Sequence, residues 1–369
     1  MTYKQLFYFT GQCLSLDDHP NFRTTIIEKI KAEDINWESF VQLCSDHLVI
    51  PAIYLKFKAH GILNVLPREL SQTLKEIYEL NSERNAKILL QIDHIIAALL
   101  PEKIVPVFLK GTANLLDGLY SDLGERMMHD IDFLVTEKDY LRTAAIMVDM
   151  EYSHNPSIYI DNRSRMHYPI LHKVGEIAPV EIHRMPVAIN HSHQFKSEMV
   201  FRDKKEVPEK IGLYVPSDPH KLLHTFIHSQ LADKGNAYKQ TSFRDFYDLY
   251  RLSKRMDVST LDGQTGYRKK SISWLVFGGK VFNLPGRFYT PETIGSRMFC
   301  CKYDLSLSFI KTHQLYVSLK KSLHLIRVGY IGGVLKALTH REERLYLFSR
   351  LKNSKWYKAH WLHYKEYIG

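Results

Sequence analysis

Two stretches of the chain decide its central architecture: IVPVFLKGT at residues 104–112 and HDIDFLV at residues 129–135. Each contains a short apolar run, rich in β-branched or aromatic residues, of the kind that forms a buried strand. The turn Lys110-Gly111 ends the first run, and a helix-like segment follows at 112–120. We therefore expect a strand, a tight turn and a helix, and then a second strand.

The residues that follow extend this sheet. A helix is expected from about 137 to 150, because its apolar residues fall on one face. Together with the two strands, this alternation predicts an α/β sheet unit over roughly residues 101–215. Three further strand candidates lie in that unit, at 157–160, 167–173 and 179–183.

Both flanks of the sheet unit have helical periodicity, with apolar residues recurring at spacings of three and four. Pro67 marks a helix start and Pro101 closes the last N-terminal helix. After Pro216 the pattern is helical again, whereas residues 263–291, rich in glycine and aromatic residues, predict an irregular connection. We expect an α+β chain, a central mixed sheet flanked by helical regions, in three parts: residues 1–100 (N-terminal helical unit), 101–215 (sheet unit) and 216–369 (C-terminal helical region).

The composition is that of a soluble globular protein, with 45% hydrophobic and 24% charged residues. No window approaches the run of about 18 apolar residues needed to span a bilayer, and early Asp17 and Asp18 make the N-terminus a poor signal peptide. The adjacent pair Cys300-Cys301 lacks the spacing of a zinc knuckle. With only four scattered cysteines, we expect free thiols and a reducing cytoplasm.

Positive charge is concentrated at the C-terminal end. Residues 281–369 hold 15 Lys and Arg against 5 Asp and Glu, a net charge of +10, which equals the net charge of the whole chain. Such a segment can face nucleic acid or another polyanion, an acidic protein or an anionic membrane surface. It can equally be a set of solvated helices whose charge aids solubility, since no arginine-rich block or aromatic RNA-binding signature accompanies it.

The pair Asp130 and Asp132 is the sharpest chemical feature. Separated by one residue at the start of a strand, the two side chains point to the same face, with Cα atoms roughly 6.6 Å apart. Carboxylates at that spacing can converge on hard divalent cations, which prefer oxygen ligands. Solvated strand ends and turn caps also show this pattern.

Upstream of this pair, the turn Lys110-Gly111-Thr112 joins a strand to a helix. Backbone N–H groups at a helix start can bind an anion, and the Lys110 ammonium or Thr112 hydroxyl can add contacts to a phosphate. The alternative is a plain connection in which Gly111 meets a backbone requirement. A phosphate cradle followed by a metal-binding carboxylate pair is the layout of a nucleotidyltransferase.

The motifs resemble a bacterial family described as uncharacterised nucleotidyltransferases, which belongs to the polymerase-beta-like superfamily. The resemblance covers about 35–255 and is poor after 280. It is carried by the following residues: Val107 to Ala113, Leu119-Tyr120, Arg126, Asp130 to Val135, Val180-Glu181-Ile182-His183, Leu222-Leu223-His224 with His228, and Arg244 to Tyr250.

Two positions depart from the family pattern. Thr112 stands where the superfamily usually has serine, and retains a hydroxyl. His129 precedes the first aspartate where a small polar residue is expected, and its imidazole can crowd a metal or contact the substrate. The pair His129-Asp130 also occurs in metal-dependent hydrolases, but that chemistry needs further histidines on helices, whereas this pair opens a strand.

The resemblance implies transfer of a nucleoside monophosphate from a nucleoside triphosphate to an acceptor hydroxyl. It implies two Mg²⁺ ions about 3.5–4 Å apart, held by Asp130, Asp132 and a third carboxylate. Glu181 is the best candidate for that third carboxylate, because its strand can lie beside Asp132. The alternative is that Glu181 simply pairs with Arg184 or another cation at the sheet rim. The acceptor stays open between a protein side chain, a small molecule and a nucleic-acid end.

Other polar residues have less specific roles in this interpretation. We expect Lys110, Gly111, Thr112 and Arg126 at the nucleotide, with Arg126 binding a phosphate or forming a salt bridge to the aspartates. His224 and His228 fit polar packing against the sheet unit better than metal binding. Arg244, Asp245 and Asp248 fit a buried ion-pair network. The alternative function is a non-catalytic regulator that binds a nucleotide or a partner protein on the same fold.

Overall fold

The computed structural model divides into two compact units, Met1–Asp304 and Leu305–Gly369. Helices lie in both terminal regions and a mixed sheet lies between them, so the expected α+β class is confirmed. The strand candidate at 157–160 falls outside the described residues. The structure describes residues 1–154, 166–208, 210–324, 326–327, 331–339, 344, 348, 357 and 361.

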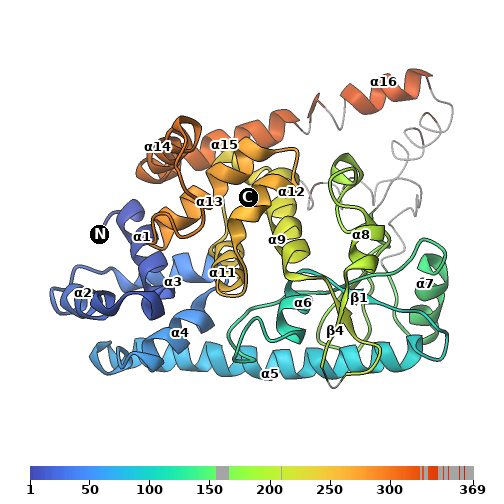
Figure 1. Ribbon diagram of the computed structural model, residues 1–369, viewed down its shortest axis with the longest axis horizontal. Helices are drawn as coiled ribbons and strands as arrows, with labels where there is room; N and C mark the ends of the chain where they lie inside the picture. Colours follow the sequence, from blue (N-terminus) through green and yellow to red (C-terminus); the bar gives the residue numbers. More distant parts are fainter. Residues whose placement is uncertain are drawn as a thin grey trace. The chain divides into compact units, whose positions relative to one another are not determined.

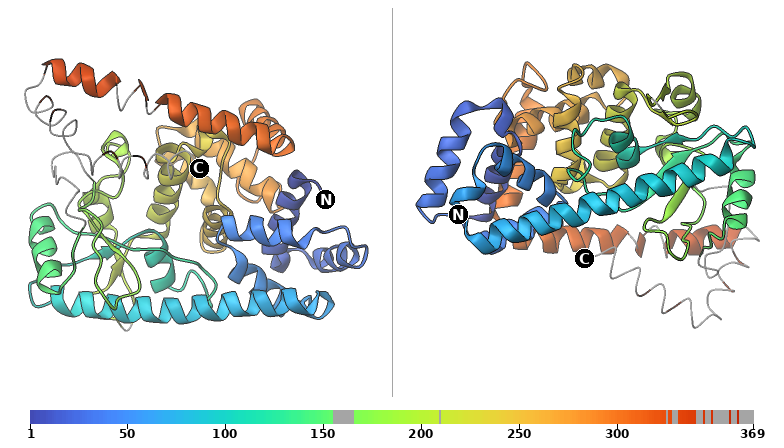
Figure 2. Two further views of the ribbon diagram at one scale, coloured as in Figure 1. Left: turned by 180° about the vertical axis from the view of Figure 1, so that it is seen from behind. Right: turned by 90° about the horizontal axis from the view of Figure 1, so that it is seen from below.

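The N-terminal hundred residues are helical, as predicted. Thr2 caps the first helix by accepting a hydrogen bond from the Gln5 backbone N–H, and the Gln5 side-chain oxygen accepts one from the Thr2 backbone N–H. The last helix begins after Pro67 and runs for 32 residues, from the N-terminal helices to the sheet (Figures 1 and 2). The five α-helices are α1 (Tyr3–Leu14), α2 (Pro20–Lys31), α3 (Trp37–Asp46), α4 (Ile50–Ala59) and α5 (Arg68–Leu99).

The described residues form one five-stranded sheet, in the order β3-β2-β1-β5-β4. Strand β2 pairs in parallel with β3 and antiparallel with β1, and β1 pairs in parallel with β5. Strands predicted at 104–109, 131–135 and 179–183 are confirmed in shortened form, whereas 167–173 contributes isolated bridges. Two strands that were not predicted, β4 and β5, complete the sheet. The five strands are β1 (Val107–Phe108), β2 (Ile131–Leu134), β3 (Val180–His183), β4 (Lys205–Glu206) and β5 (Tyr214–Val215).

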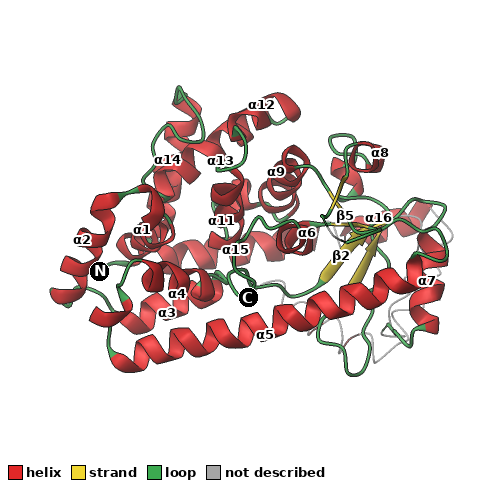
Figure 3. Ribbon diagram, turned by 60° about the horizontal axis from the view of Figure 1, so that its bottom comes forward, coloured by secondary structure: helices red, strands yellow, loops and turns green. Residues whose placement is uncertain are grey.

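The two faces of the sheet differ in chemistry. Ile131 and Phe133 are fully buried in a core that includes apolar residues of α5 and of α7 (Tyr140–Asp149), which lie beside the strands (Figure 3). Because side chains alternate along a strand, Asp132 points to the opposite face. That face meets α6 (Lys110–Leu116), which packs on β2 and on α9 (Asp218–Phe226). The polar face is therefore enclosed between the sheet and helices.

The region 216–304 is helical, but one prediction for it is wrong. Residues 268–281 form a buried helix rather than an irregular connection. Its glycines are contact positions: a Cβ at Gly278 would lie 3.0 Å from the Leu249 side chain. The elements of this part are α9, the π-helical turn η4 (Ile227–Ala232), α10 (Gly235–Tyr238), α11 (Phe243–Leu252), α12 (Leu261–Gln264), α13 (Arg268–Val281) and α14 (Ile294–Ser308).

In the second unit, the helices described are α15 (Ile310–His324) and α16 (Gly332–Thr339). Across the residues that the structure describes, no helix is both long and apolar enough to cross a membrane. All four cysteines are free thiols, as expected.

Candidate active site at the polar face of the sheet

Two carboxylates lie side by side on the polar face. Asp132 of β2 and Glu181 of β3 are register partners on parallel neighbouring strands, so their side chains share one face. The prediction that the strand of Glu181 lies beside Asp132 is confirmed. His183 follows on the same face, and the ligand atoms of these three residues lie within 4.8 Å of one another. The sheet itself thus brings together donors able to hold a metal ion.

Two basic groups neutralise this carboxylate pair. The Lys110 ammonium lies 2.5 Å from Asp132 Oδ1 and 3.7 Å from Glu181 Oε2. His183 Nε2 lies 2.8 Å from Asp132 Oδ1 and 3.3 Å from Glu181 Oε2. Burial alone would raise the pKa of Asp132, but Lys110 and then His183 hold that pKa well below its ordinary value. Burial would likewise raise the pKa of Glu181, but the hydrogen bond from His183 lowers that pKa below its ordinary value. Both carboxylates are ionised at neutral pH.

Asp130 stands at the edge of the same cluster in a different electrostatic state. Burial, followed by the negative charge of Asp132, raises the pKa of the Asp130 carboxyl. Among the described residues, none forms a hydrogen bond or an ion pair with its side chain. A half-buried carboxylate that is repelled by its neighbour, and on which Lys110 and Arg244 act only through longer-range charge, can also serve as an oxygen donor to a divalent cation. Asp132, Glu181 and His183 thus form a group able to hold a metal ion, and the Asp130 carboxyl lies close enough to interact with the Asp132 charge.

The turn before α6 differs in detail from the expected one. The left-handed backbone conformation lies at Lys110, with φ at 48°, and not at Gly111. Gly111 is required for space instead, because a Cβ there would lie 2.1 Å from Arg126 Nη1. Thr112 is buried, and its hydroxyl donates to the Asp130 carbonyl at 3.4 Å, a long hydrogen bond. The turn thus links the lysine to the strand that carries the aspartates.

Replacing Gly111 by alanine is expected to destabilise the fold by about 1–3 kcal/mol, the usual range for overpacking. The new methyl group would displace the Arg126 guanidinium, which Asp248 holds in a buried ion pair. Urea unfolding of both proteins measures the change. Gly263→Ala in α12 is the control, because a Cβ there meets nothing within 4 Å. Equal stability of the two variants would contradict the packing role of Gly111.

Arg126 does not form the salt bridge to Asp130 or Asp132 that was one of its two predicted roles. Its Nε and Nη2 donate to the carboxylate of Asp248, at 2.9 and 2.7 Å. Tyr120 donates to the same carboxylate at 2.5 Å. The reason is burial: both charges are inside the protein, where an ion pair needs close, two-point geometry. The predicted buried network at Asp248 is confirmed, and a phosphate contact by Arg126 stays a prediction.

His129 immediately precedes Asp130, and its side chain is exposed. Within the described part of the chain, the group of closely spaced ligand atoms does not include it. Burial, followed by the charges of Arg244, Arg84 and Arg126, lowers the pKa of its imidazole. Positive charges of arginines therefore dominate the electrostatic surroundings of the imidazole, and these surroundings do not favour a metal-dependent hydrolase pair.

Three polar residues of α5, not singled out from the sequence, hold the loop that leads into β2. Arg84 donates to the carbonyls of Met128, His129 and Ile177 at 3.2–3.3 Å. Asn81 and Asn85 both donate to the Arg126 carbonyl. Their i, i+3, i+4 spacing on one helical face was a visible signal. His183 was also recognisable, since strand alternation places it on the face of Glu181.

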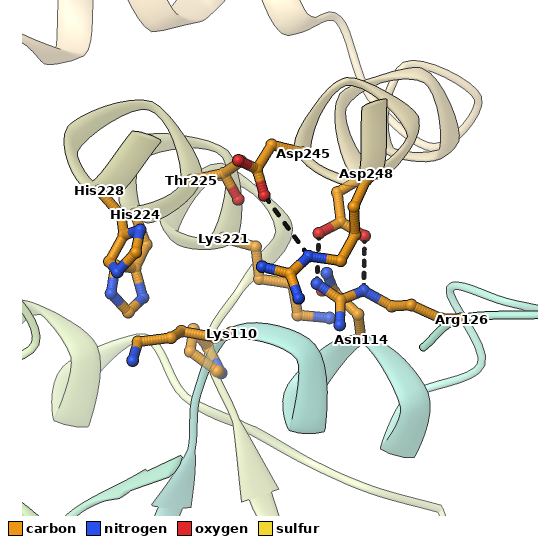
Figure 4. Close-up of a pocket in the computed structure, with 11 residues that line it drawn as sticks. Lys110, Asn114, Arg126, Lys221, His224, Thr225, His228, Asp245 and Asp248 are labelled. Atoms are coloured by element: carbon orange, nitrogen blue, oxygen red, sulfur yellow. Dashed lines mark hydrogen bonds and ion pairs between the residues drawn. The ribbon is translucent and has the colours of Figure 1, made fainter. Parts of the chain in front are cut away.

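A small pocket of about 60 Å³ adjoins the cluster on its helical side (Figure 4). His224 is 3% exposed, and its ring packs 5.7 Å from that of Phe195, which confirms the predicted packing role. His228 lies 3.1 Å from Asp233. The pocket is lined by Lys110, Asn114, Arg126, Pro216, Lys221, His224, Thr225, His228, Arg244, Asp245 and Asp248.

Comparison with known proteins agrees with the resemblance seen in the motifs. A family model described as "Uncharacterised nucleotidyltransferase" matches residues 33–265, more than half of the chain. No curated protein matches the chain significantly.

Proposed function

Because the chain belongs to the family of uncharacterised nucleotidyltransferases, we propose that it transfers a nucleoside monophosphate from a nucleoside triphosphate to an acceptor hydroxyl. The observation that carries this proposal is the register pair of Asp132 and Glu181, with Asp130 beside it. Three carboxylates gathered at one edge of a sheet, next to a lysine and a polar pocket, suit phosphoryl chemistry, in which charge must be neutralised.

Mg²⁺ is the proposed cofactor, with two ions expected, and Asp130, Asp132 and Glu181 are its proposed ligands. The support is the donor set itself, since carboxylate oxygens are the ligands that Mg²⁺ prefers. When bound, such ions neutralise charge on the phosphates and lower the barrier to displacement. Lys110 and Gly111-Thr112 are proposed to contact the triphosphate, with Arg126 close behind them.

The protein's own groups have distinct tasks in this reaction. The acceptor oxygen forms a bond to the α-phosphorus while the bond from that phosphorus to the bridging oxygen breaks, and pyrophosphate leaves. Glu181 is proposed to take the proton of the acceptor hydroxyl. His183 orients Glu181 and Asp132 through its contacts with both carboxylates. The Lys110 ammonium offsets the negative charge that gathers in the transition state.

The geometry favours an enzyme over a regulator that only binds nucleotide. The regulator alternative rested on the imidazole of His129 beside the first aspartate and on a third carboxylate that the sequence alone could not establish. Among the described residues, His129 is not part of the group of closely spaced ligand atoms, and Glu181 is in register with Asp132. The acceptor, whether a protein side chain, a small molecule or a nucleic-acid end, stays open. The cytoplasm stays the predicted location, because the few scattered cysteines are typical of a protein from a reducing compartment.

Incubation with a mixture of the four ribonucleoside triphosphates and Mg²⁺ is expected to release pyrophosphate and to add a nucleoside monophosphate to an acceptor. Pyrophosphate release is read by a coupled assay, and the mass added to protein, small-molecule and RNA acceptors by mass spectrometry. The variant Glu181→Gln is the matched control for contaminating activity. If the protein binds the triphosphate tightly but releases no pyrophosphate with any of these acceptors present, that result would count against nucleotidyl transfer and in favour of the regulator.

A further inference from the structure

The pocket beside the carboxylate cluster contains buried polar atoms without partners. Asn114 Oδ1, His224 Nε2 and Arg244 Nε are all buried and form no hydrogen bond with the described residues. The nearest anion to Arg244 Nε is Asp245, whose Oδ1 lies 3.9 Å away, beyond hydrogen-bond distance. A buried polar atom without a partner costs about 1–3 kcal/mol. Three such atoms lining one pocket indicate a polar ligand there.

The side chains come from two sides of the pocket. Lys110 and Asn114 lie one helical turn apart on α6, and the rings of His224 and His228 hang from α9 and η4 above Lys110 (Figure 4). Arg244 reaches in from α11. Because Lys110 also contacts Asp132 and Glu181, the pocket continues directly from the carboxylate cluster.

The donor groups of the lining suit an oxygen-rich anion, whereas Asn114 Oδ1 can only accept a hydrogen bond and does not bear on this choice. Lys110 and Arg244 can only donate hydrogen bonds. Burial, followed by the charge of Lys110, holds the pKa of His224 well below its ordinary value, so its ring is neutral and can donate from Nε2 in one tautomer.

The two acids in the lining do not oppose such an anion. Asp248 is neutralised by Arg126. Burial raises the pKa of Asp245, and its Oδ1 lies 3.9 Å from Arg244 Nε, whose positive charge offsets that of the carboxylate. The remaining lysine, Lys221, is already paired with Asp117.

We propose that Lys110, His224 and Arg244 bind the terminal phosphates of the triphosphate, the two that leave as pyrophosphate. This inference rests on the proposed function, because the carboxylate cluster then marks the position of the α-phosphorus. A volume of about 60 Å³ is far below the roughly 300 Å³ of a pocket for a drug-sized ligand. A space of that size suits small phosphate groups better than a whole nucleoside. In this proposal, His224 and Arg244 contact the substrate although they lie outside the motif of Asp130 and Asp132.

The experiment is calorimetric titration of the full chain with inorganic pyrophosphate, ATP and AMP, each with Mg²⁺. His224→Asn and Arg244→Gln are each expected to weaken pyrophosphate and ATP binding about tenfold, the loss of one hydrogen bond to a charged group. AMP affinity is expected to stay unchanged, because AMP lacks the terminal phosphates. His220→Asn is the control: His220 lies one turn earlier on α9, is buried against the same Phe195 ring, and does not line the pocket.

Equal losses in the His220 and His224 variants, or equal losses of ATP and AMP affinity, would overturn the assignment. Thermal unfolding of each variant separates lost binding from lost folding. The outcome is separate from that of the transfer assay. If pyrophosphate binding depends on His224 and Arg244 but the protein transfers no nucleotide, the phosphate-binding pocket is supported and the proposed enzymatic function is contradicted. If transfer is insensitive to both substitutions, the enzymatic function is supported and the phosphate-binding pocket is contradicted.

Discussion

The double variant Asp130→Asn, Asp132→Asn is expected to lose nearly all Mg²⁺-assisted binding of a nucleoside triphosphate. The two amides remove the negative charges proposed to hold the cation, and leave Lys110 and His183 without their anionic partner on β2. Calorimetric titration with ATP, in the presence and absence of Mg²⁺, measures the difference that the cation makes. We expect that difference to disappear, while binding without Mg²⁺ persists or tightens because the Lys110 charge is released.

Folding has to be controlled in this experiment, because Asp132 is 1% exposed and contacts two basic groups. Asp130→Asn alone leaves those contacts intact and is expected to reduce the Mg²⁺ effect without altering the unfolding temperature. Asp149→Asn, an exposed position on α7, controls for the loss of one negative charge. A double variant that folds and keeps the full Mg²⁺ dependence would remove the metal site from these aspartates.

Local alternation in the sequence was enough to predict the carboxylate pair. A strand with period two fixes that Asp130 and Asp132 share a face, and the same rule applies to Glu181 and His183. What a local pattern cannot supply is the partner of Arg126. Asp248 lies 122 residues further along the chain, and the pairing depends on how α11 packs against the sheet unit. Long-range ion pairs follow from tertiary packing, so sequence reasoning offered the nearer aspartates instead.

Helix α13 shows the same limit for secondary structure. Each glycine in a helix costs about 1 kcal/mol relative to alanine, so Gly278-Gly279 among aromatic residues gave the appearance of a loop. Trp274 and Phe277 on this helix are almost completely buried, and the close packing that the glycines permit outweighs the propensity. Strands β4 and β5 were missed for another reason, since each has only two residues and shows no periodicity.

The basic residues 281–369 supply none of the described side chains that line the carboxylate cluster or the pocket. The residues that line the cluster and the pocket all precede the boundary at Asp304. A polyanion or an acidic protein as their partner remains a prediction from charge. If such a partner exists, its binding should weaken steeply with added salt, because counterion release scales with the number of phosphate contacts.

Replacing Glu181 by glutamine is expected to lower nucleotidyl transfer by at least about a hundredfold, the lower scale for losing general-base assistance. Glutamine keeps the size and hydrogen bonding of the side chain and removes its charge. The affinity for the triphosphate should largely persist, because Asp130 and Asp132 remain as ligands and Lys110 remains at the turn. Pyrophosphate release under saturating triphosphate measures the transfer rate, and calorimetry measures the affinity.

The matched control is Glu176→Gln. Glu176 is another acid close to β3, but its carboxylate lies 3.7 Å from His94 Nδ1, and it is not part of the cluster with Asp132. Asp161, a further acid of the sheet unit that could replace Glu181 as the third carboxylate, falls outside the described residues. Full activity in the Glu176 variant with a large loss in the Glu181 variant would assign the proton acceptor to β3. Full activity in both variants would contradict the role of Glu181 as proton acceptor. No other described acid on β3 could take that role, because Glu181 alone is in register with Asp132.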